Sequence, residues 1–252
     1  MRLLDKVALI TGGSRGVGRG IAIGYAREGA DVLVHYRTQR EQAEVVVEEI
    51  RNMGRKAEAL QVDMGDAEVI EHFIEKAWNV FKRIDILVNN AGIAHFESFL
   101  KLRFEQWRRV MSVNLDGVML CSQLVARKMV ENNIQGKIIN ISSVNGFQVE
   151  KDHIDYNVSK AGLDMLTKSM ATELGPYGIN VNSISPDIVK TDILPDGFWE
   201  KEGKAFVKKT PLGRKAEVED CVGPAIFLAS NESNYMQGQI LVLDGGMSIT
   251  QL

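Results

Sequence analysis

The chain has 252 residues, a formal net charge of −3 and a hydrophobic fraction of 45%. This composition suits a globular protein with a sizeable core, and it contains no basic block or basic-aromatic stripe that would indicate nucleic-acid binding. No apolar run approaches the roughly 20 residues of a membrane span, and the first residues lead directly into an apolar strand, which leaves no room for a signal peptide. The two cysteines, Cys121 and Cys221, lack the spacing of a metal or redox site. These features predict a soluble cytoplasmic protein without a metal site.

Short apolar runs alternate with helical patterns along the whole chain. Strands are predicted at residues 7–10, 31–36, 56–62, 84–88, 136–141, 179–184 and 239–243. Helices are predicted after residue 18 and at residues 40–53, 66–81, 104–132 with an interruption near Asn114, 154–174 and 217–229. Such alternation is typical of a parallel sheet with helices on both faces. The sequence therefore predicts a single α/β domain over residues 1–252, built on a doubly wound, seven-stranded and mostly parallel sheet.

The turn after the first predicted strand is rich in glycine. It reads Thr11-Gly12-Gly13-Ser14-Arg15-Gly16-Val17-Gly18 and precedes a helix face marked by Ile21 and Tyr25. Glycine lets the backbone come close to a phosphate because no Cβ stands in the way, and the free N–H groups of a helix start favour an anion. A turn of this kind is weak evidence when it stands alone.

Other informative residues follow the ends of the predicted strands, where ligands bind in sheets of this type. They are Tyr36-Arg37, Asp63, Asn89 to Gly92, Ser142-Ser143 and Pro186. The connection at about residues 186–214 holds three of the five prolines and is long, so it is predicted to be a functional substrate loop. Phe198 and Trp199 within it could form an apolar lid or a subunit contact.

Tyr156 and Lys160 lie four residues apart on the predicted helix at 154–174, which places them side by side on one face. A tyrosine with its ordinary pKa of about 10 is a poor acid or base at neutral pH. A neighbouring ammonium group favours the phenolate and would lower that pKa. Such a pair is common on helices and usually has no catalytic meaning by itself.

Taken together, the motifs resemble those of the short-chain dehydrogenase/reductase family. The matching pieces are the Thr11-Gly12-x-x-x-Gly16-x-Gly18 turn, Asn89-Asn90-Ala91-Gly92, Asn114, Ser143, Tyr156-x-x-x-Lys160, Asp63 and Asp244-Gly245-Gly246. Their order and spacing cover essentially the whole chain. The resemblance implies a Rossmann-like fold and an oxidoreductase that acts on CH–OH groups with a nicotinamide cofactor.

The resemblance also implies catalytic roles for Asn114, Ser143, Tyr156 and Lys160. Ser143 would stabilise charge on the substrate oxygen, Tyr156 would transfer the proton, Lys160 would tune Tyr156 and bind the ribose, and Asn114 would hold a water on the proton path. Ser143 lies thirteen residues before Tyr156 and opens a turn with Gly146, as the family's serine does. Ser142 meets neither condition and is interpreted as a packing or turn residue.

The cofactor is predicted to be NADP(H), with NAD(H) possible. Members that prefer NAD carry an acid at the end of the second strand, where this chain has Tyr36 followed by Arg37. Arg15 and Arg37 would suit a 2′-phosphate. The full set of predicted cofactor contacts is Gly12, Ser14, Arg15, Gly16, Val17, Gly18, Tyr36, Arg37, Asp63, Met64, Asn90, Ala91, Gly92, Tyr156, Lys160, Pro186, Ile188 and Thr191.

One residue departs from the family pattern. Asp187 stands after Pro186 where the family normally has glycine. The substitution adds a side chain beside the expected nicotinamide position. It puts the local backbone path and the contacts of residues 187–188 in doubt, but not the reaction class.

The substrate is predicted to be a small carbonyl or alcohol, of sugar or polyol type, with a 3-oxoacyl-carrier-protein reductase as the alternative. His95, Asp152, His153 and Asp155 flank the expected site and would suit a substrate rich in hydroxyl groups. An acidic carrier needs a basic dock, for which only Arg127 and Lys128 are candidates.

Two further alternatives are a non-catalytic cofactor-binding sensor on the same scaffold and a methyltransferase. The family resemblance also implies a homotetramer, to which the residues 236–252 could contribute.

Overall fold

The computed structural model describes residues 1–191, 197, 199 and 203–250. It contains one sheet of seven parallel strands in the order β3-β2-β1-β4-β5-β6-β7. The strands are β1 Val7–Ile10, β2 Asp31–Tyr36, β3 Ala57–Gln61, β4 Ile86–Asn89, β5 Lys137–Ile141, β6 Asn180–Pro186 and β7 Ile240–Leu243. The predicted Rossmann-like sheet is confirmed, and the strand ends differ from the expected ones by at most a few residues.

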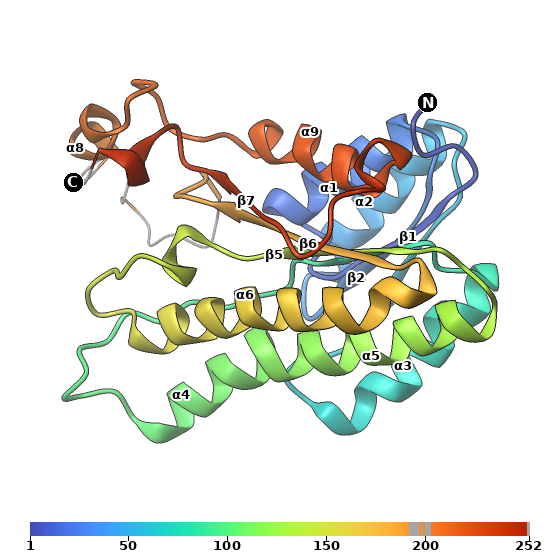
Figure 1. The fold of residues 1–252 in the computed structure, drawn as a ribbon, viewed down its shortest axis with the longest axis horizontal. Coiled ribbons are helices and arrows are strands. Elements are labelled where there is room, and N and C mark those ends of the chain that lie inside the picture. The colour runs from blue at the N-terminus through green and yellow to red at the C-terminus, as the bar shows by residue number, and fades with distance from the viewer. Residues whose placement is uncertain (192–196, 198, 200–202, 251–252) are drawn as a thin grey trace.

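Helices cover both faces of this sheet (Figure 1). One face carries α1 Gly16–Arg27, α2 Arg40–Asn52 and α9 Val218–Ala229. The other carries α3 Ala67–Phe81, α4 Phe104–Met111, α5 Gly117–Glu131 and α6 Ile154–Leu174. A short helix, α8 Gly203–Lys209, lies within the connection predicted at residues 186–214. Part of that connection, including Phe198, lies outside the described residues.

The strands are apolar on both sides because both faces of the sheet are covered. In β1, Ala8 and Ile10 belong to the core under α1, α2 and α9, while Val7 and Leu9 belong to the core on the α3 and α5 side. This alternation follows from the two-residue period of a strand, and burial on both sides is typical of parallel sheets. None of the described helices combines the length and the apolar composition that crossing a bilayer requires.

The strand order reverses at β1, which lies between β2 and β4. In open parallel sheets the loops at this position diverge and leave a crevice beyond the carboxyl ends of the strands. The loops after β1, β4 and β5 therefore border this crevice.

A buried histidine supports the loop after β1. The backbone N–H of Gly12 donates to His35 Nδ1 at 2.9 Å, and His35 Nε2 lies 3.0 Å from the carbonyl oxygen of Val62. Since Nδ1 accepts, the proton resides on Nε2, which donates to Val62. Burial lowers the pKa of His35 to about 4, with hydrogen bonding to Val62 and the charge of Asp63 opposing this effect. The neutral imidazole is therefore the form that the folded chain requires.

We expect His35 to make the stability of the fold sensitive to acid. The unfolded chain gains a proton at this side chain near pH 6.5 and the folded chain only near pH 4, so the stabilisation present above pH 6.5 is lost as the pH falls through this window. The difference in pKa corresponds to about 3 kcal/mol. Urea unfolding of His35→Gln at pH 7 and pH 4 should show a smaller acid-induced loss than the wild-type chain. His72→Gln, at an exposed histidine of α3, is the control, and an unchanged loss in His35→Gln would contradict this role.

Candidate active site

The glycine-rich loop joins β1 to α1 through two residues in the left-handed region. Gly12 has φ +65° and Gly16 has φ +55°, conformations that disfavour other residues. A Cβ at Gly18 would collide with the carbonyl oxygen of Gly12 and the side-chain amide of Asn90. The helix start thus packs directly on the loop. No side chain caps the first turn of α1, which leaves its N–H groups available to an anion.

Asn90 ties this loop to the one after β4. Its side-chain nitrogen donates to the carbonyl oxygens of Thr11 at 2.9 Å and Gly12 at 3.0 Å. In return, Thr11 Oγ1 accepts hydrogen bonds from the backbone N–H groups of Asn90 and Ala91, both at 3.0 Å. The four bonds hold the two sides of the crevice at a set separation.

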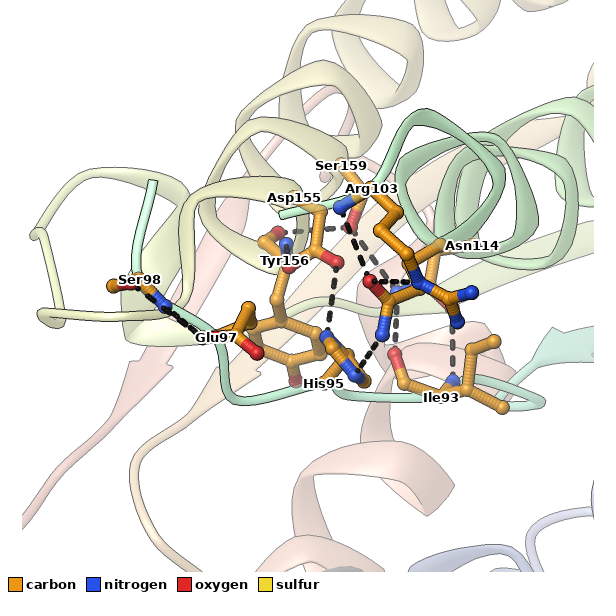
Figure 2. A network of polar contacts seen from close by, with 10 residues as sticks. Ile93, His95, Glu97, Ser98, Arg103, Asn114, Asp155, Tyr156 and Ser159 are labelled. Atoms are coloured by element: carbon orange, nitrogen blue, oxygen red, sulfur yellow. Dashed lines mark hydrogen bonds and ion pairs between the residues drawn. The ribbon is translucent and has the colours of Figure 1, made fainter. Parts of the chain in front are cut away.

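The interruption predicted near Asn114 is a turn of π-helix, Ser112–Asp116, between α4 and α5. Such turns are frequent at functional sites. Asn114 is buried, and its side chain accepts from the N–H of Ile93 and donates to the carbonyl oxygen of Ile93, both at 2.9 Å (Figure 2). It also donates to Ser159 Oγ at 3.1 Å. Asn114 therefore joins the loop after β4 to helix α6.

Ser143, Tyr156 and Lys160 meet where β5 ends and α6 begins. The Ser143 side chain lies close enough to Tyr156 to act on its pKa. Lys160 Nζ donates to the carbonyl oxygen of Ile141 at 2.8 Å and lies 5.4 Å from the centre of the Tyr156 ring. Ser142 Oγ instead donates to the carbonyl oxygen of Lys160 at 3.4 Å.

Burial dominates the electrostatics of this trio. It raises the pKa of Tyr156 to about 12, against the lowering effect of the Ser143 hydrogen bond and together with the charge of Glu150. It lowers the pKa of Lys160 to about 8, although Asp164 opposes this. The expected lowering of the Tyr156 pKa by Lys160 is therefore wrong, because both groups are desolvated and Nζ is directed to Ile141. Tyr156 is held as the neutral phenol.

A cavity of about 320 Å³ runs from the glycine-rich loop to Ser143, Tyr156 and Lys160. Nearly all the predicted cofactor contacts line it: Gly12, Ser14, Arg15, Gly16, Val17, Tyr36, Arg37, Asp63, Met64, Asn90, Ala91, Gly92, Tyr156, Lys160, Pro186, Ile188 and Thr191. Gly18 and Asn114 are not lining residues. Gly18 instead packs against Gly12 and Asn90, and Asn114 is hydrogen-bonded to Ile93, so both support residues that line the cavity.

Of the four polar residues expected to flank the substrate, only His153 lines the cavity. Asp155 is buried and accepts from the backbone N–H of Tyr156 at 2.8 Å, and His95 Nδ1 lies 4.0 Å from its other oxygen (Figure 2). Gln106 binds the far nitrogen of His95 at 2.7 Å. The contacts among Asp155, His95 and Gln106 therefore support the start of α6. Asp152 does not line the cavity either.

Arg109 of α4 is a cavity residue that the sequence did not indicate. Its Nη2 donates to both carboxylate oxygens of Asp63, at 2.9 and 2.8 Å. Burial raises the pKa of Asp63, but hydrogen bonds from Arg109 and Gly65 hold it below its ordinary value. Asp63 is thus an ionised and already paired carboxylate at the cavity wall. No spacing rule links two residues 46 positions apart.

Asp187, the departure from the family pattern, also lines the cavity. Its backbone N–H donates to the carbonyl oxygen of Leu243 at 3.0 Å, so the residue continues the pairing of β6 with β7. Its Oδ2 is buried and has no hydrogen-bond partner among the described residues. Burial raises the pKa of this carboxyl to about 6.

Comparison with known proteins places the chain. A family model described as enoyl-(acyl carrier protein) reductase matches residues 12–248. The chain is 39% identical to an L-rhamnose 1-dehydrogenase (NADP(+)) of Thermoplasma acidophilum, over 97% of this chain and 96% of the relative. It is 37% identical to a 3-oxoacyl-[acyl-carrier-protein] reductase of Staphylococcus aureus, over 97% of this chain and 98% of the relative.

The chain is also similar to a solved structure over nearly its whole length. The gluconate 5-dehydrogenase of Burkholderia cenocepacia, in complex with NADP and tartrate, superposes with a TM-score of 0.92 at 35% identity, over 98% of this chain and 97% of that one. These matches agree with the glycine-rich loop and with the Ser143, Tyr156 and Lys160 arrangement. The chain belongs to the short-chain dehydrogenase/reductase family.

Proposed function

We propose that the chain is an NADP-preferring oxidoreductase that interconverts a secondary alcohol and a carbonyl group on a sugar or polyol. The observation that carries this proposal is one cavity with two distinct ends. At one end Ser143, Tyr156 and Lys160 lie together, and at the other lie Arg15, Arg37 and the start of α1. The names of the L-rhamnose and gluconate dehydrogenases agree with this substrate class.

The residues present fit a nicotinamide dinucleotide. The uncapped N–H groups at the start of α1 suit its pyrophosphate, and Lys160, lining the cavity with a buried ammonium group, suits the ribose of the nicotinamide half. Pro186, Ile188 and Thr191 would border the nicotinamide ring. When bound, the cofactor supplies the hydride donor or acceptor for the reaction.

The chain's own residues handle the substrate oxygen and its proton. Ser143 Oγ would donate a hydrogen bond to that oxygen and stabilise the charge that develops on it. The phenol of Tyr156, whose pKa is raised to about 12, carries the proton that a carbonyl substrate needs. In the direction of alcohol oxidation, Ser143 would favour the phenolate, as its lowering effect on the Tyr156 pKa indicates. Asn114 would order a water beside Lys160.

Arg37 is proposed to select NADP over NAD. It follows Tyr36 at the end of β2, and no acid stands at that position to bind the ribose hydroxyls. A guanidinium group matches a phosphate with paired hydrogen bonds, whereas NAD offers it only hydroxyl groups. Arg15 borders the same end of the cavity.

The alternative, a 3-oxoacyl-carrier-protein reductase, has support from the Staphylococcus aureus relative. Of the two candidate docking residues for its acidic carrier, Arg127 is exposed. Lys128, one of two candidate docking residues, is paired with Glu75 at 2.6 Å and lies over the Trp78 ring. Reduction of a 3-oxoacyl thioester faster than of any sugar-derived carbonyl would favour this alternative.

We also propose a cytoplasmic homotetramer. Both cysteines are free and buried, which suits a reducing compartment. Val158 and Met165, seven residues apart on α6, are exposed, as is Met119 on α5. Light scattering should report four chains per particle, and Met165→Lys should shift the mass toward smaller species. A wild-type mass of one chain would contradict the assembly.

Tyr156→Phe should lower kcat by about 10³-fold, because the variant has no transferable proton at the substrate oxygen. NADPH affinity, measured by fluorescence titration, should change little since the ring remains. Tyr177→Phe, at an exposed tyrosine outside the cavity, is the matched control. Activity retained in Tyr156→Phe would exclude the proposed proton transfer.

Arg37→Ala should weaken NADPH binding by about tenfold to a hundredfold, the value of a lost charged hydrogen bond, and leave NADH binding nearly unchanged. Dissociation constants for both cofactors measure this by calorimetry. Arg27→Ala removes an exposed arginine from the last turn of α1 and serves as control. Equal losses for the two cofactors would show that Arg37 does not contact the 2′-phosphate.

A further inference from the structure

Carboxylates gather at the catalytic end of the cavity. Glu150 and Asp187 line it there, together with Ser143 and Tyr156, and their charges interact with one another. The arginines that line the cavity, Arg15, Arg37 and Arg109, accompany the glycine-rich loop, β2 and Asp63. The two carboxylates thus lie where the substrate would react and the three arginines where the cofactor phosphates would lie, while the cation at the catalytic end, Lys160, donates to the carbonyl oxygen of Ile141.

His153 is buried at the catalytic end and has one nitrogen to spare. Its side chain is 5% exposed, and Nδ1 lies 3.2 Å from Glu150 Oε2. Because the carboxylate accepts, Nδ1 carries a proton. Nε2 is buried and without a hydrogen-bond partner among the described residues. The centre of the ring lies 3.7 Å from that of Phe96, with the two planes tilted by 37°, and 5.4 Å from that of Tyr156.

Glu150 is positioned to orient His153. Asn145 donates to the same Oε2 at 3.4 Å, and the same amide donates to Asn157 at 2.9 Å, which anchors the group to α6. The hydrogen bond from His153 lowers the pKa of Glu150 against the effect of burial, so the carboxylate is ionised. Its charge fixes the imidazole tautomer and orientation.

Two buried atoms at this end therefore lack partners within the described chain: Nε2 of His153 and Oδ2 of Asp187. An unpaired buried polar atom is energetically unfavourable, and a ligand that pairs it removes this cost. A sugar hydroxyl donates one hydrogen bond and accepts others, so hydroxyl groups can satisfy both atoms. A carboxylate group placed here has no proton to donate to Asp187, and it would be repelled by the charges of Glu150 and Asp187.

We propose that Glu150, His153 and Asp187 form a hydroxyl-binding subsite that admits an uncharged sugar or polyol and rejects sugar acids. The inference rests on the proposed function and narrows its substrate class. His153 and Asp187 contact the substrate, and Glu150 is a positioning residue that acts through His153. Sequence identity alone does not distinguish a neutral sugar from a sugar acid as the substrate, since the L-rhamnose dehydrogenase is 39% identical to this chain and the gluconate dehydrogenase 35% identical. The subsite makes this distinction.

The test compares neutral and anionic probes on matched variants. With NADP⁺, kcat/KM is measured for L-rhamnose, D-sorbitol and D-gluconate, of which the last two share a six-carbon chain and differ in charge. The wild-type enzyme should favour the better neutral probe over gluconate by about tenfold or more. Asp187→Asn keeps the shape and removes the charge, and it should reduce this ratio by about fivefold. Asp152→Asn, at an exposed carboxylate outside the cavity, should leave the ratio unchanged.

His153→Gln and Glu150→Gln test the imidazole. Each should raise KM for the neutral probe by about tenfold with a smaller change in kcat, since a binding contact is lost while Ser143 and Tyr156 remain. NADPH affinity should be unchanged in all variants, which separates this effect from unfolding. A wild-type preference for gluconate, or a ratio unmoved in Asp187→Asn, would overturn the proposal.

A measurement of sugar binding that does not depend on turnover tests the subsite separately from the proposed function. Saturation-transfer NMR of the NADP⁺-loaded enzyme reports whether L-rhamnose or sorbitol binds more tightly than gluconate, whatever the turnover. Neutral binding that is lost in His153→Gln supports the subsite even if no probe is oxidised, an outcome that would instead count against the proposed function. Turnover of all probes at equal efficiency would support the function and refute the subsite.

Discussion

The arrangement of the whole site depends on the amide of Asn90, which binds the backbone oxygens of Thr11 and Gly12 across the point where the strand order reverses. Parallel strands on either side of such a point send their loops in opposite directions, so nothing in the sheet itself holds the loops together. The Asn90 bonds, answered by those to Thr11 Oγ1, supply that restraint. They leave the first-turn N–H groups of α1 and the carboxyl end of β5 opening onto one cavity.

A second constraint is the cost of burial at the reacting end. Desolvation favours the neutral forms of Tyr156, Lys160 and Asp187. It raises the pKa values of Tyr156 and Asp187 and lowers that of Lys160. A site of this kind discriminates between ligands through charge, because each uncompensated charge inside it is expensive. The neutral phenol of Tyr156 and the ionised, hydrogen-bonded Glu150 are the two states that the surroundings favour most clearly.

The sequence predicted the doubly wound parallel sheet, the helix interruption at Asn114 and most of the cavity residues near the glycine-rich loop. Those features follow from local patterns: apolar runs, glycines at left-handed positions and the four-residue spacing of Tyr156 and Lys160. The Arg109–Asp63 pair and the His153–Glu150–Asn145 group could not be predicted, because they depend on side chains that come together only after the helices pack. The prediction that the pKa of Tyr156 is lowered was wrong for the same reason, because the spacing of residues along the chain does not show how deeply a side chain is buried.

The π-helical turn at Ser112–Asp116 has a consequence for how the family's length can vary. Such a turn accommodates one extra residue within an otherwise continuous helix. Removing one residue there would restore a regular α-helical turn, while the residues before and after it would keep their faces. Asn114 lies within the turn and would lose its place beside Ile93 and Ser159, whereas the face of α5 that packs on α3 would stay where it is. The chain can change length in its surface loops, but at this turn its residue count is part of the architecture.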